Sequence, residues 1–225
     1  MTPAQPAPAT TRLAATRLAA TTRLADGAEL PAGGRLANGT RLADGTELPA
    51  AGRWQIDPGH TELAFIGRHF MLTKVRGRFT GLSGVIQIAE EPGDSTVELT
   101  IDMASVESGS QARDEHLRSA DLFDVVRHPR ATFSGHAAGW HGTRGLLTGV
   151  LTIREIARPV TLQAEYLGYA ADPWGGHRAV FTAAGTIDRE DWGLTWNLPL
   201  DGGGLLVSKE IRIEIELEAV LDPEI

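Results

Sequence analysis

The feature that most constrains this chain is an alternation of apolar and polar residues with a period of two, which begins soon after residue 53. In TVELTIDM at 96–103 and in IRIEIELE at 211–218, every odd position is apolar and nearly every even position is polar or charged. Successive side chains of a β-strand point to opposite faces, so this pattern is typical of strands with one packed face and one face in water.

Similar segments recur along the chain and are separated by turn sequences. They lie at 62–66, 75–79, 84–88, 130–137, 145–153, 160–167 and 179–187, with turns at 90–94, 141–145 and 172–176. Many short, evenly spaced strands favour an all-β sandwich or barrel, and closing a barrel removes exposed edges. About eight strands suffice to enclose one ligand. The main helical candidate, SQARDEHLRSADLF at 110–123, is predicted to cap one mouth of the barrel.

The chain before the barrel has a different period. Residues 17–52 divide into six hexads with a Leu at every sixth position from Leu18 to Leu48, and residues 23–35 recur with small changes at 41–53. Hexapeptide repeats with a superperiod of 18 are typical of a parallel β-helix. A flexible tether rich in Ala, Gly and Pro is the alternative, because two coils bury little surface. Both interpretations stay open.

The resulting domain prediction has three parts. They are a disordered N-terminus at 1–16, the hexapeptide-repeat segment at 17–52 and a β-barrel domain at 53–225. If the hexads form a short β-helix, its open ends would be covered by stacking on another subunit. We therefore expect a homo-oligomer, either a dimer or a larger assembly.

Composition excludes several classes of protein. The chain has no cysteine, so disulfides, thiolate metal sites and cysteine nucleophiles are ruled out. Its net charge of −8 argues against nucleic acid as a partner, because phosphate binding requires a basic surface. The N-terminal MTPAQPAPAT lacks the basic and apolar regions of a secretory signal, and we expect a cytoplasmic location.

Several motifs resemble the YceI-like family of lipocalin-like barrels. They occur in family order at 54–69, 75–86, 108–133, 147–162 and 187–197. The resemblance implies an extended eight-stranded antiparallel barrel that holds a polyisoprenoid, isoprenoid quinone or fatty-acyl compound, often as a dimer. The chain departs from the family pattern at Thr61, Leu122, Trp192 and the turn at 154–157, and the hexads have no counterpart in the minimal family domain.

Two kinds of side chain are candidates for ligand binding. An inward-facing aromatic residue either fills a core or lines a cavity, and the resemblance implies a hollow barrel. The aromatic candidates are Phe65, Phe79, Phe133, Phe181, Trp192 and Trp196. The candidates for the polar end of the ligand, at the mouth, are His69, Arg113 and Arg118.

The sequence gives less support to a catalytic or metal site than to a ligand-binding site. The stretch RDEHLRS at 113–119 contains acid, base and arginine groups, but GxSxG, HExxH and phosphate-loop motifs are absent. The pair His136 and His141 is too few ligands for zinc, and His60 is interpreted as a buried hydrogen-bonding residue at a strand start.

The sequence therefore predicts a lipid-binding protein for storage or transport. We expect it to be no enzyme and to need no metal and no cofactor besides the bound lipid. Transient membrane contact stays open. The alternatives are a lipid-directed hydrolase or isomerase that uses the RDEH segment, and an assembly protein that acts through the hexads.

Overall fold

The computed structural model describes residues 45–171, 173, 176–200 and 204–222 of the chain. It also describes two short strands, β1 (Thr22–Arg23) and β2 (Glu29–Leu30), which pair antiparallel. The predicted N-terminus at 1–16, and the rest of the predicted hexad segment at 17–52 up to residue 44, lie outside the described residues. The choice between β-helix and tether therefore stays a prediction.

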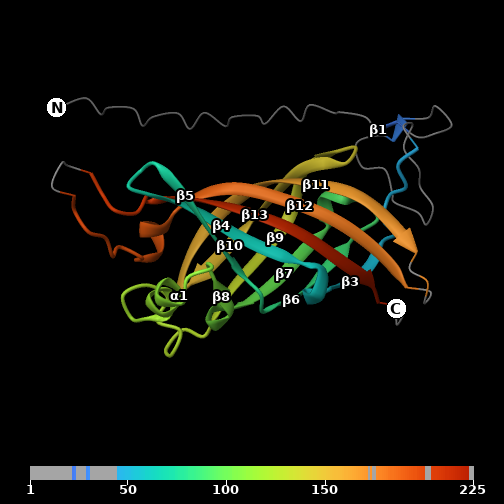
Figure 1. Cartoon of the computed structure of the whole chain (residues 1–225). Coiled ribbons are helices and arrows are strands. Elements are labelled where there is room, and N and C mark those ends of the chain that lie inside the picture. Colours follow the sequence, from blue (N-terminus) through green and yellow to red (C-terminus); the bar gives the residue numbers. More distant parts are fainter. Residues whose placement is uncertain are drawn as a thin grey trace, which may run out of the picture.

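Eleven further strands form one continuous antiparallel sheet, shown in Figure 1. They are β3 (Gly52–Ile56), β4 (Glu62–His69), β5 (Thr73–Phe79), β6 (Leu82–Ile88), β7 (Thr96–Asp102), β8 (Val106–Glu107), β9 (Arg130–His141), β10 (Arg144–Ile153), β11 (Ile156–Ala171), β12 (His177–Asp188) and β13 (Glu210–Leu221). Every strand predicted from the alternation is confirmed. β3 and β8 were missed because they are short: β8 has two residues, and the alternation in β3 spans only five.

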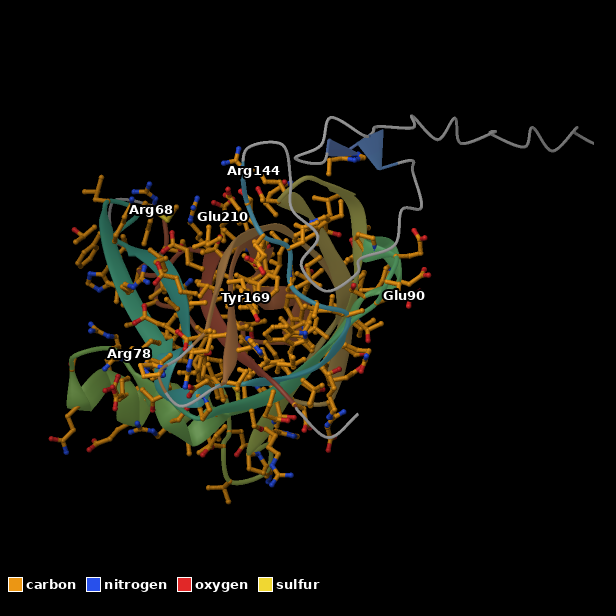
Figure 2. The ribbon with its side chains drawn as sticks, turned by 90° about the vertical axis from the view of Figure 1, so that its right-hand side faces the viewer. Arg68, Arg78, Glu90, Arg144, Tyr169 and Glu210 are labelled. Atoms are coloured by element: carbon orange, nitrogen blue, oxygen red, sulfur yellow. The ribbon has the colours of Figure 1, made fainter. Side chains whose placement is uncertain are left out.

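The sheet closes into a barrel through the pairing of β12 with β13. The ring runs β13–β12–β11–β10–β9–β7–β6–β3 and returns to β13, which confirms the predicted eight-stranded barrel. Figure 2 shows the ring from one end, with charged side chains such as Arg78, Glu90 and Arg144 around its outside. Closure satisfies the backbone groups that an open edge would expose.

The wall bends where β3 passes into β4. The 3-10 helix η1 (Pro58–His60) separates these strands, yet both pair with β13, β3 through residues 219–221 and β4 through residues 212–216. β5 and β8 continue the wall beyond β4. Among the described strands, β8 pairs with β5 and not with β9, and the excursion of the chain at 108–129 connects β8 to β9.

That excursion holds the single α-helix of the described residues, α1 (Gln111–Arg118). The helix is shorter than the predicted 110–123. It ends at Ser119, whose hydroxyl donates to the His116 carbonyl and accepts from the Asp121 amide, in competition with helical bonds. Leu117 packs against the barrel core, so α1 caps one end of the barrel, hereafter the helix end (Figure 1).

Three further 3-10 helices connect the strands: η2 (Pro92–Asp94), η3 (Met103–Ser105) and η4 (Arg189–Trp192). None of the helices in the described part of the chain is long and apolar enough to cross a bilayer.

The opposite end of the barrel is closed by residues 47–50, and we call it the plug end. Leu48 is only 7% exposed and Pro49 is buried. The Tyr166 hydroxyl donates to the Glu47 carbonyl at 2.7 Å, and Trp54 Nε1 donates to the Ala50 carbonyl at 3.0 Å. The last predicted hexad thus packs with the barrel, so the packed chain includes residues at least six positions before the predicted boundary at 53.

Candidate functional site

The interior of the barrel holds an elongated, largely apolar cavity of about 710 Å³. Its walls are the inward faces of the alternating strands, so Ile211, Ile213, Ile215 and Leu217 all line it. The charged residues between them, such as Arg212 and Glu214, form ion pairs on the outside. The cavity is of the size typical for small-molecule sites, which are usually concave and apolar with a few polar groups.

The cavity runs from the plug end to the helix end of the barrel. Leu48, Pro49, Trp140 and Tyr166 line it at the plug end. The residues that line it at the helix end include Arg68, His69, Arg113, His116, Arg189, Leu194 and Trp196. The polar lining residues therefore gather mainly at one end, and a ligand would meet a different chemistry at each end.

Seven of the nine residues predicted to bind ligand line this cavity. They are Phe65, His69, Phe79, Arg113, Phe133, Phe181 and Trp196. The rings of Phe65 and Phe79 lie 5.5 Å apart between centroids, and Phe181 contacts Tyr166 at 5.3 Å. Whether these residues contact a ligand stays a prediction.

The structure places the other two predicted residues outside the cavity lining. Trp192 is 1% exposed, and its Nε1 donates to the Leu151 carbonyl at 3.0 Å, so it fills the core beneath η4. Arg118 donates from Nε to the Ala104 carbonyl at 2.8 Å and from Nη2 to the Val106 carbonyl. Arg118 thereby ties α1 to the chain around β8.

Two rings of the cavity wall lie over glycines. Gly77 is the cross-strand partner of Phe65, and a Cβ added there would lie 2.3 Å from Phe65 Cζ. A Cβ added at Gly135 would lie 2.6 Å from Phe133 Cε1. The absence of a side chain at these glycines lets the rings lie flat against the wall.

The polar groups predicted at the mouth are partly engaged by the protein itself. Arg113 donates to the Ser108 hydroxyl at 2.7 Å and to the Ser108 carbonyl at 2.6 Å. The His116 ring contacts Trp196 edge to face at 4.3 Å and lies 3.4 Å from an Asp121 oxygen. These contacts order α1 over the helix end.

Arg189 is the functional candidate that the sequence did not single out. It lines the cavity and is only 6% exposed, and burial lowers the pKa of its guanidinium. The one signal in the sequence is an arginine within a family motif, which does not distinguish a buried cation from an exposed one. Its position depends on contacts with residues 194 and 208.

The plug end contributes residues that the sequence also missed. Tyr166 faces the cavity, and burial raises the pKa of its phenol well above the usual value, so the hydroxyl stays neutral. Its bond to the Glu47 carbonyl fixes the segment that carries Leu48. Because the partners are 119 residues apart, no local pattern indicated this contact.

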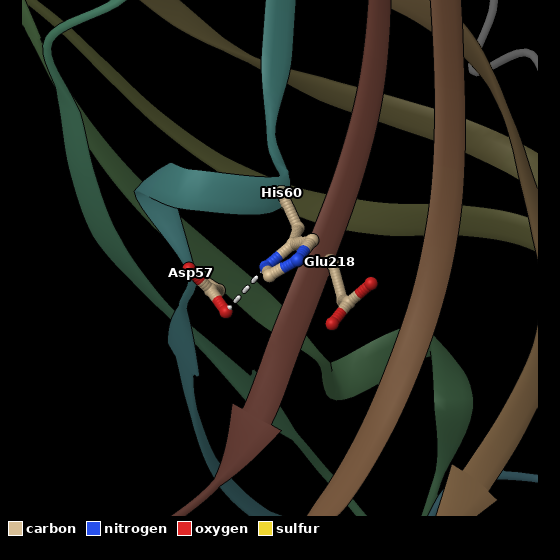
Figure 3. Close-up of side chains that lie close together, drawn as sticks. All are labelled: Asp57, His60 and Glu218. Carbon is tan, nitrogen blue, oxygen red and sulfur yellow. Dashed lines mark hydrogen bonds and ion pairs between the residues drawn. The ribbon is translucent and has the colours of Figure 1, made fainter. Parts of the chain in front are cut away.

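Asp57, His60 and Glu218 lie together on the barrel exterior, as Figure 3 shows. His60 was predicted to be buried but is exposed, because η1 turns it outward; its Nδ1 lies 3.0 Å from Asp57 Oδ2. Arg178 pairs with both carboxylates, with its Nη1 2.8 Å from Asp57 Oδ2. The arginine lowers the pKa of Asp57 to about 2, so this cluster is an ion-pair network centred on a resident cation.

The RDEH segment at 113–116 forms the middle half of α1. Arg113 is held by Ser108, Glu115 accepts from Gln111, and Asp114 accepts from Ser108. These are contacts within or beside the helix. These contacts form a hydrogen-bond network that holds α1 in place over the cavity.

Comparison with known proteins adds a family assignment. The model of the family described as YceI-like domain matches residues 54–219. Protein YceI of Salmonella newport is 34% identical over 162 residues, covering 72% of this chain and 82% of that protein. The UPF0312 protein PSPA7_0523 of Pseudomonas paraeruginosa is 32% identical over 162 residues, with the same coverage of both chains.

Solved structures share the fold. The YCEI protein of Campylobacter jejuni superposes with a TM-score of 0.59 at 29% identity, covering 69% of this chain and 90% of that one. A polyisoprenoid binding domain from Saccharophagus degradans gives a TM-score of 0.58 at 18% identity, covering 75% of this chain and 98% of that one. With its motifs, its barrel and the match over residues 54–219, this chain belongs to the YceI-like domain family.

Proposed function

We propose that the barrel binds one long-chain apolar lipid in its interior and stores or transports it. The observation that carries the proposal is the apolar cavity of about 710 Å³ enclosed by the barrel wall. Burying a methylene group contributes about 0.8 kcal/mol, so a chain of roughly ten such groups would gain about 8 kcal/mol, which corresponds to micromolar affinity.

Three ligand classes fit this proposal: polyisoprenoids, isoprenoid quinones and fatty-acyl compounds. Each combines a long apolar chain with a smaller head that could lie among the polar groups of the helix end. The name of the Saccharophagus degradans neighbour, a polyisoprenoid binding domain, supports the first class.

We propose a binding role in preference to catalysis. The acid and base groups of the RDEH segment are engaged in ordering α1. General acid-base chemistry would need groups aimed at a reacting atom with matched pKa values. A purified protein that hydrolysed or isomerised the lipid it carries would contradict the proposal.

The direct test is native mass spectrometry of the full chain, followed by organic extraction and identification of the lipid. Phe133→Arg introduces an unpaired charge into the cavity and should abolish lipid retention. Thr132→Arg is the matched control, because Thr132 is exposed on the same strand. Equal lipid content in wild type and a folded Phe133→Arg variant would refute the binding site.

A further inference from the structure

Arg189 combines deep burial with an unsatisfied donor. Its Nε donates to the Ser208 carbonyl at 3.0 Å and its Nη1 donates to the Leu194 carbonyl. Its Nη2 is buried and has no hydrogen-bond partner among the residues that the structure describes. A buried charged group without a full set of hydrogen-bond partners is strongly disfavoured. Nη2 therefore needs a hydrogen-bond acceptor that the described residues do not supply.

The neighbouring acidic residues have other partners. Glu190 forms an ion pair with Lys209 at 2.7 Å. Asp188 accepts from the Glu190 amide at 2.9 Å and thereby caps η4. Both carboxylates raise the pKa of Arg189 through their charge, but burial outweighs them. Arg189 lines the cavity, and Nη2 is the guanidinium nitrogen that no hydrogen-bond partner in the described part of the chain engages.

We infer that Arg189 Nη2 binds the polar end of the lipid, and that this end carries an anionic or carbonyl oxygen such as a carboxylate or phosphate. The inference rests on the proposed lipid-binding function. It places the principal anchor for the polar end of the lipid at the buried Arg189 instead of at Arg113 and Arg118. Arg118 lies outside the cavity lining, and Arg113 already donates twice to Ser108.

The test compares two probes with the same chain, dodecanoate and dodecanol, in the full-length protein. A hydrogen bond to a charged group predicts that wild type binds dodecanoate about 10- to 100-fold more tightly than dodecanol. Arg189→Met should remove that preference while keeping dodecanol affinity. Arg158→Met is the matched control, because Arg158 is an exposed residue of β11 outside the cavity lining and should keep the preference.

Arg189 also holds two backbone carbonyls, so Arg189→Met could unfold. A second measurement on wild type avoids this problem: the Nε–H NMR signal of Arg189 should shift with dodecanoate and much less with dodecanol, while that of Arg158 stays in place. If both probes bind equally and the Arg189 signal does not move, the anchor is refuted. If neither probe binds, the proposed function fails instead.

A second, independent feature lies at the turn between β4 and β5. Phe70, Met71 and Leu72 are large apolar residues exposed to solvent, and Leu72 is 79% exposed. Leu198, also exposed, belongs to the adjacent segment, since Phe70 N donates to the Leu206 carbonyl at 2.8 Å and Leu206 N donates to the Leu198 carbonyl at 3.0 Å. We call Phe70, Met71, Leu72 and Leu198 the tip patch.

The backbone of the tip patch is locally unfavourable for its residues. Phe70 and Met71 have φ values of 52° and 58°, in the left-handed region where Asn and Gly are preferred. Bulky apolar side chains kept in such conformations on a surface suggest a role outside folding. Exposed apolar patches of this kind mark contacts with proteins, ligands or membranes.

The charge of the residues beside the tip patch indicates which kind of partner it binds. Arg68 and Lys74 are cross-strand partners beside the tip, and both are exposed. Like charges directly opposite one another are destabilising, and an anionic surface would remove that cost. This basic pair contrasts with the net charge of −8 for the whole chain. The tip also adjoins the cavity, because the Phe70 ring contacts His69 at 4.3 Å and His69 lines it.

We propose that the tip patch inserts into the interface of an anionic lipid membrane and turns the helix end of the cavity toward it. Apolar side chains flanked by basic residues are the combination that binds such surfaces. This second inference also rests on the proposed function, because contact at the cavity mouth would let the lipid pass between bilayer and barrel.

Co-sedimentation with vesicles tests the membrane contact. The full chain should bind vesicles of equal parts phosphatidylcholine and phosphatidylglycerol, bind pure phosphatidylcholine weakly, and lose binding as salt is added. The double variant Met71→Asn/Leu72→Ser should weaken binding roughly tenfold. Asn suits the left-handed backbone, so the fold should persist.

Leu167→Ser is the matched control, because Leu167 is an exposed apolar residue on β11 outside the cavity lining. It should bind vesicles like wild type. Equal vesicle binding by wild type and the tip variant, or no vesicle binding by wild type, would overturn the membrane contact. Lipid content of the purified proteins, measured in parallel, reports separately on the proposed function.

Discussion

At the residue scale, small side chains shape the cavity as much as large ones. Phe65 lies over Gly77, and Phe133 lies over Gly135, at distances that leave no room for a methyl group. Gly77 faces Phe65 across the strand pair β4–β5, whereas Gly135 lies two residues from Phe133 on the same face of β9. Glycines beside the aromatic rings thus set how closely those rings approach the cavity wall.

Gly77→Ala tests this pairing. The added methyl would overlap the Phe65 ring, so we expect the free energy of unfolding to fall by about 1 to 3 kcal/mol in urea denaturation. Gly93→Ala is the control, because a Cβ there meets no atom within 4 Å. Equal stability of the two variants would show that the ring moves aside freely.

Asp57→Asn tests the ion-pair network on the exterior. The pKa of Asp57 is about 2 in the folded chain against 3.8 ordinarily, chiefly because Arg178 binds the carboxylate. A lowered folded pKa gives stability above pH 4 that is lost as the pH falls toward 2, here up to about 2 kcal/mol. Wild type should therefore lose more free energy of unfolding than Asp57→Asn between pH 4 and pH 2, and parallel urea curves would contradict the assignment.

At the element scale, the hexad segment and the barrel meet inside residues 47–52. Leu48 and Pro49 occupy the plug end, while β3 begins at Gly52. The matched family region starts at residue 54, so the plug residues lie outside it. The last hexad is therefore part of the packed barrel.

Two truncations separate these roles. Deleting residues 1–44 should leave the free energy of unfolding and the lipid content unchanged. Deleting residues 1–52 removes the buried Leu48 and the partner of the Tyr166 hydroxyl, and should lower the free energy of unfolding by roughly 2 to 4 kcal/mol. Equal stability of the two truncated chains in urea would show that the plug is dispensable.

The same truncations address self-association. If the hexads join subunits, both deletions should lower the oligomer mass measured by light scattering. An unchanged mass, together with protease sensitivity of residues 17–44 in the intact chain, would favour the tether.

At the scale of the whole molecule, the two ends of the barrel differ in chemistry. The plug end presents Leu48, Pro49 and a neutral Tyr166, whereas the helix end presents Arg113, Arg189 and His69. A closed wall leaves only these ends for exchange of a ligand. A lipid should therefore lie with its polar end toward α1 and its chain toward residues 47–50.

A spin-labelled fatty acid tests this orientation. With the label near the terminal methyl, NMR signals of Leu48 should broaden more than those of Leu117, and with the label near the carboxylate the order should reverse. Equal broadening at both ends in a protein that binds the probe would show that the ligand has no preferred direction.

The sequence by itself determined the β-class, the positions of most strands and the inward face of each one, because alternation is a local property of the chain. Ile211, Ile213, Ile215 and Leu217 could be assigned to one face from IRIEIELE alone, and all four line the cavity. The family motifs extended this to the number of strands in the barrel and to seven cavity-lining residues.

Only the tertiary structure decided which polar groups have partners and what closes each end. Arg189 depends on the carbonyls of Leu194 and Ser208, and Leu48 depends on a bond that joins Tyr166 to Glu47. Arg118 and Arg113 look alike in sequence, yet one ties α1 to the chain around β8 and the other lines the cavity. Burial and hydrogen bonding of a side chain depend on residues that are distant in the chain. Local periodicity therefore carries no information about them.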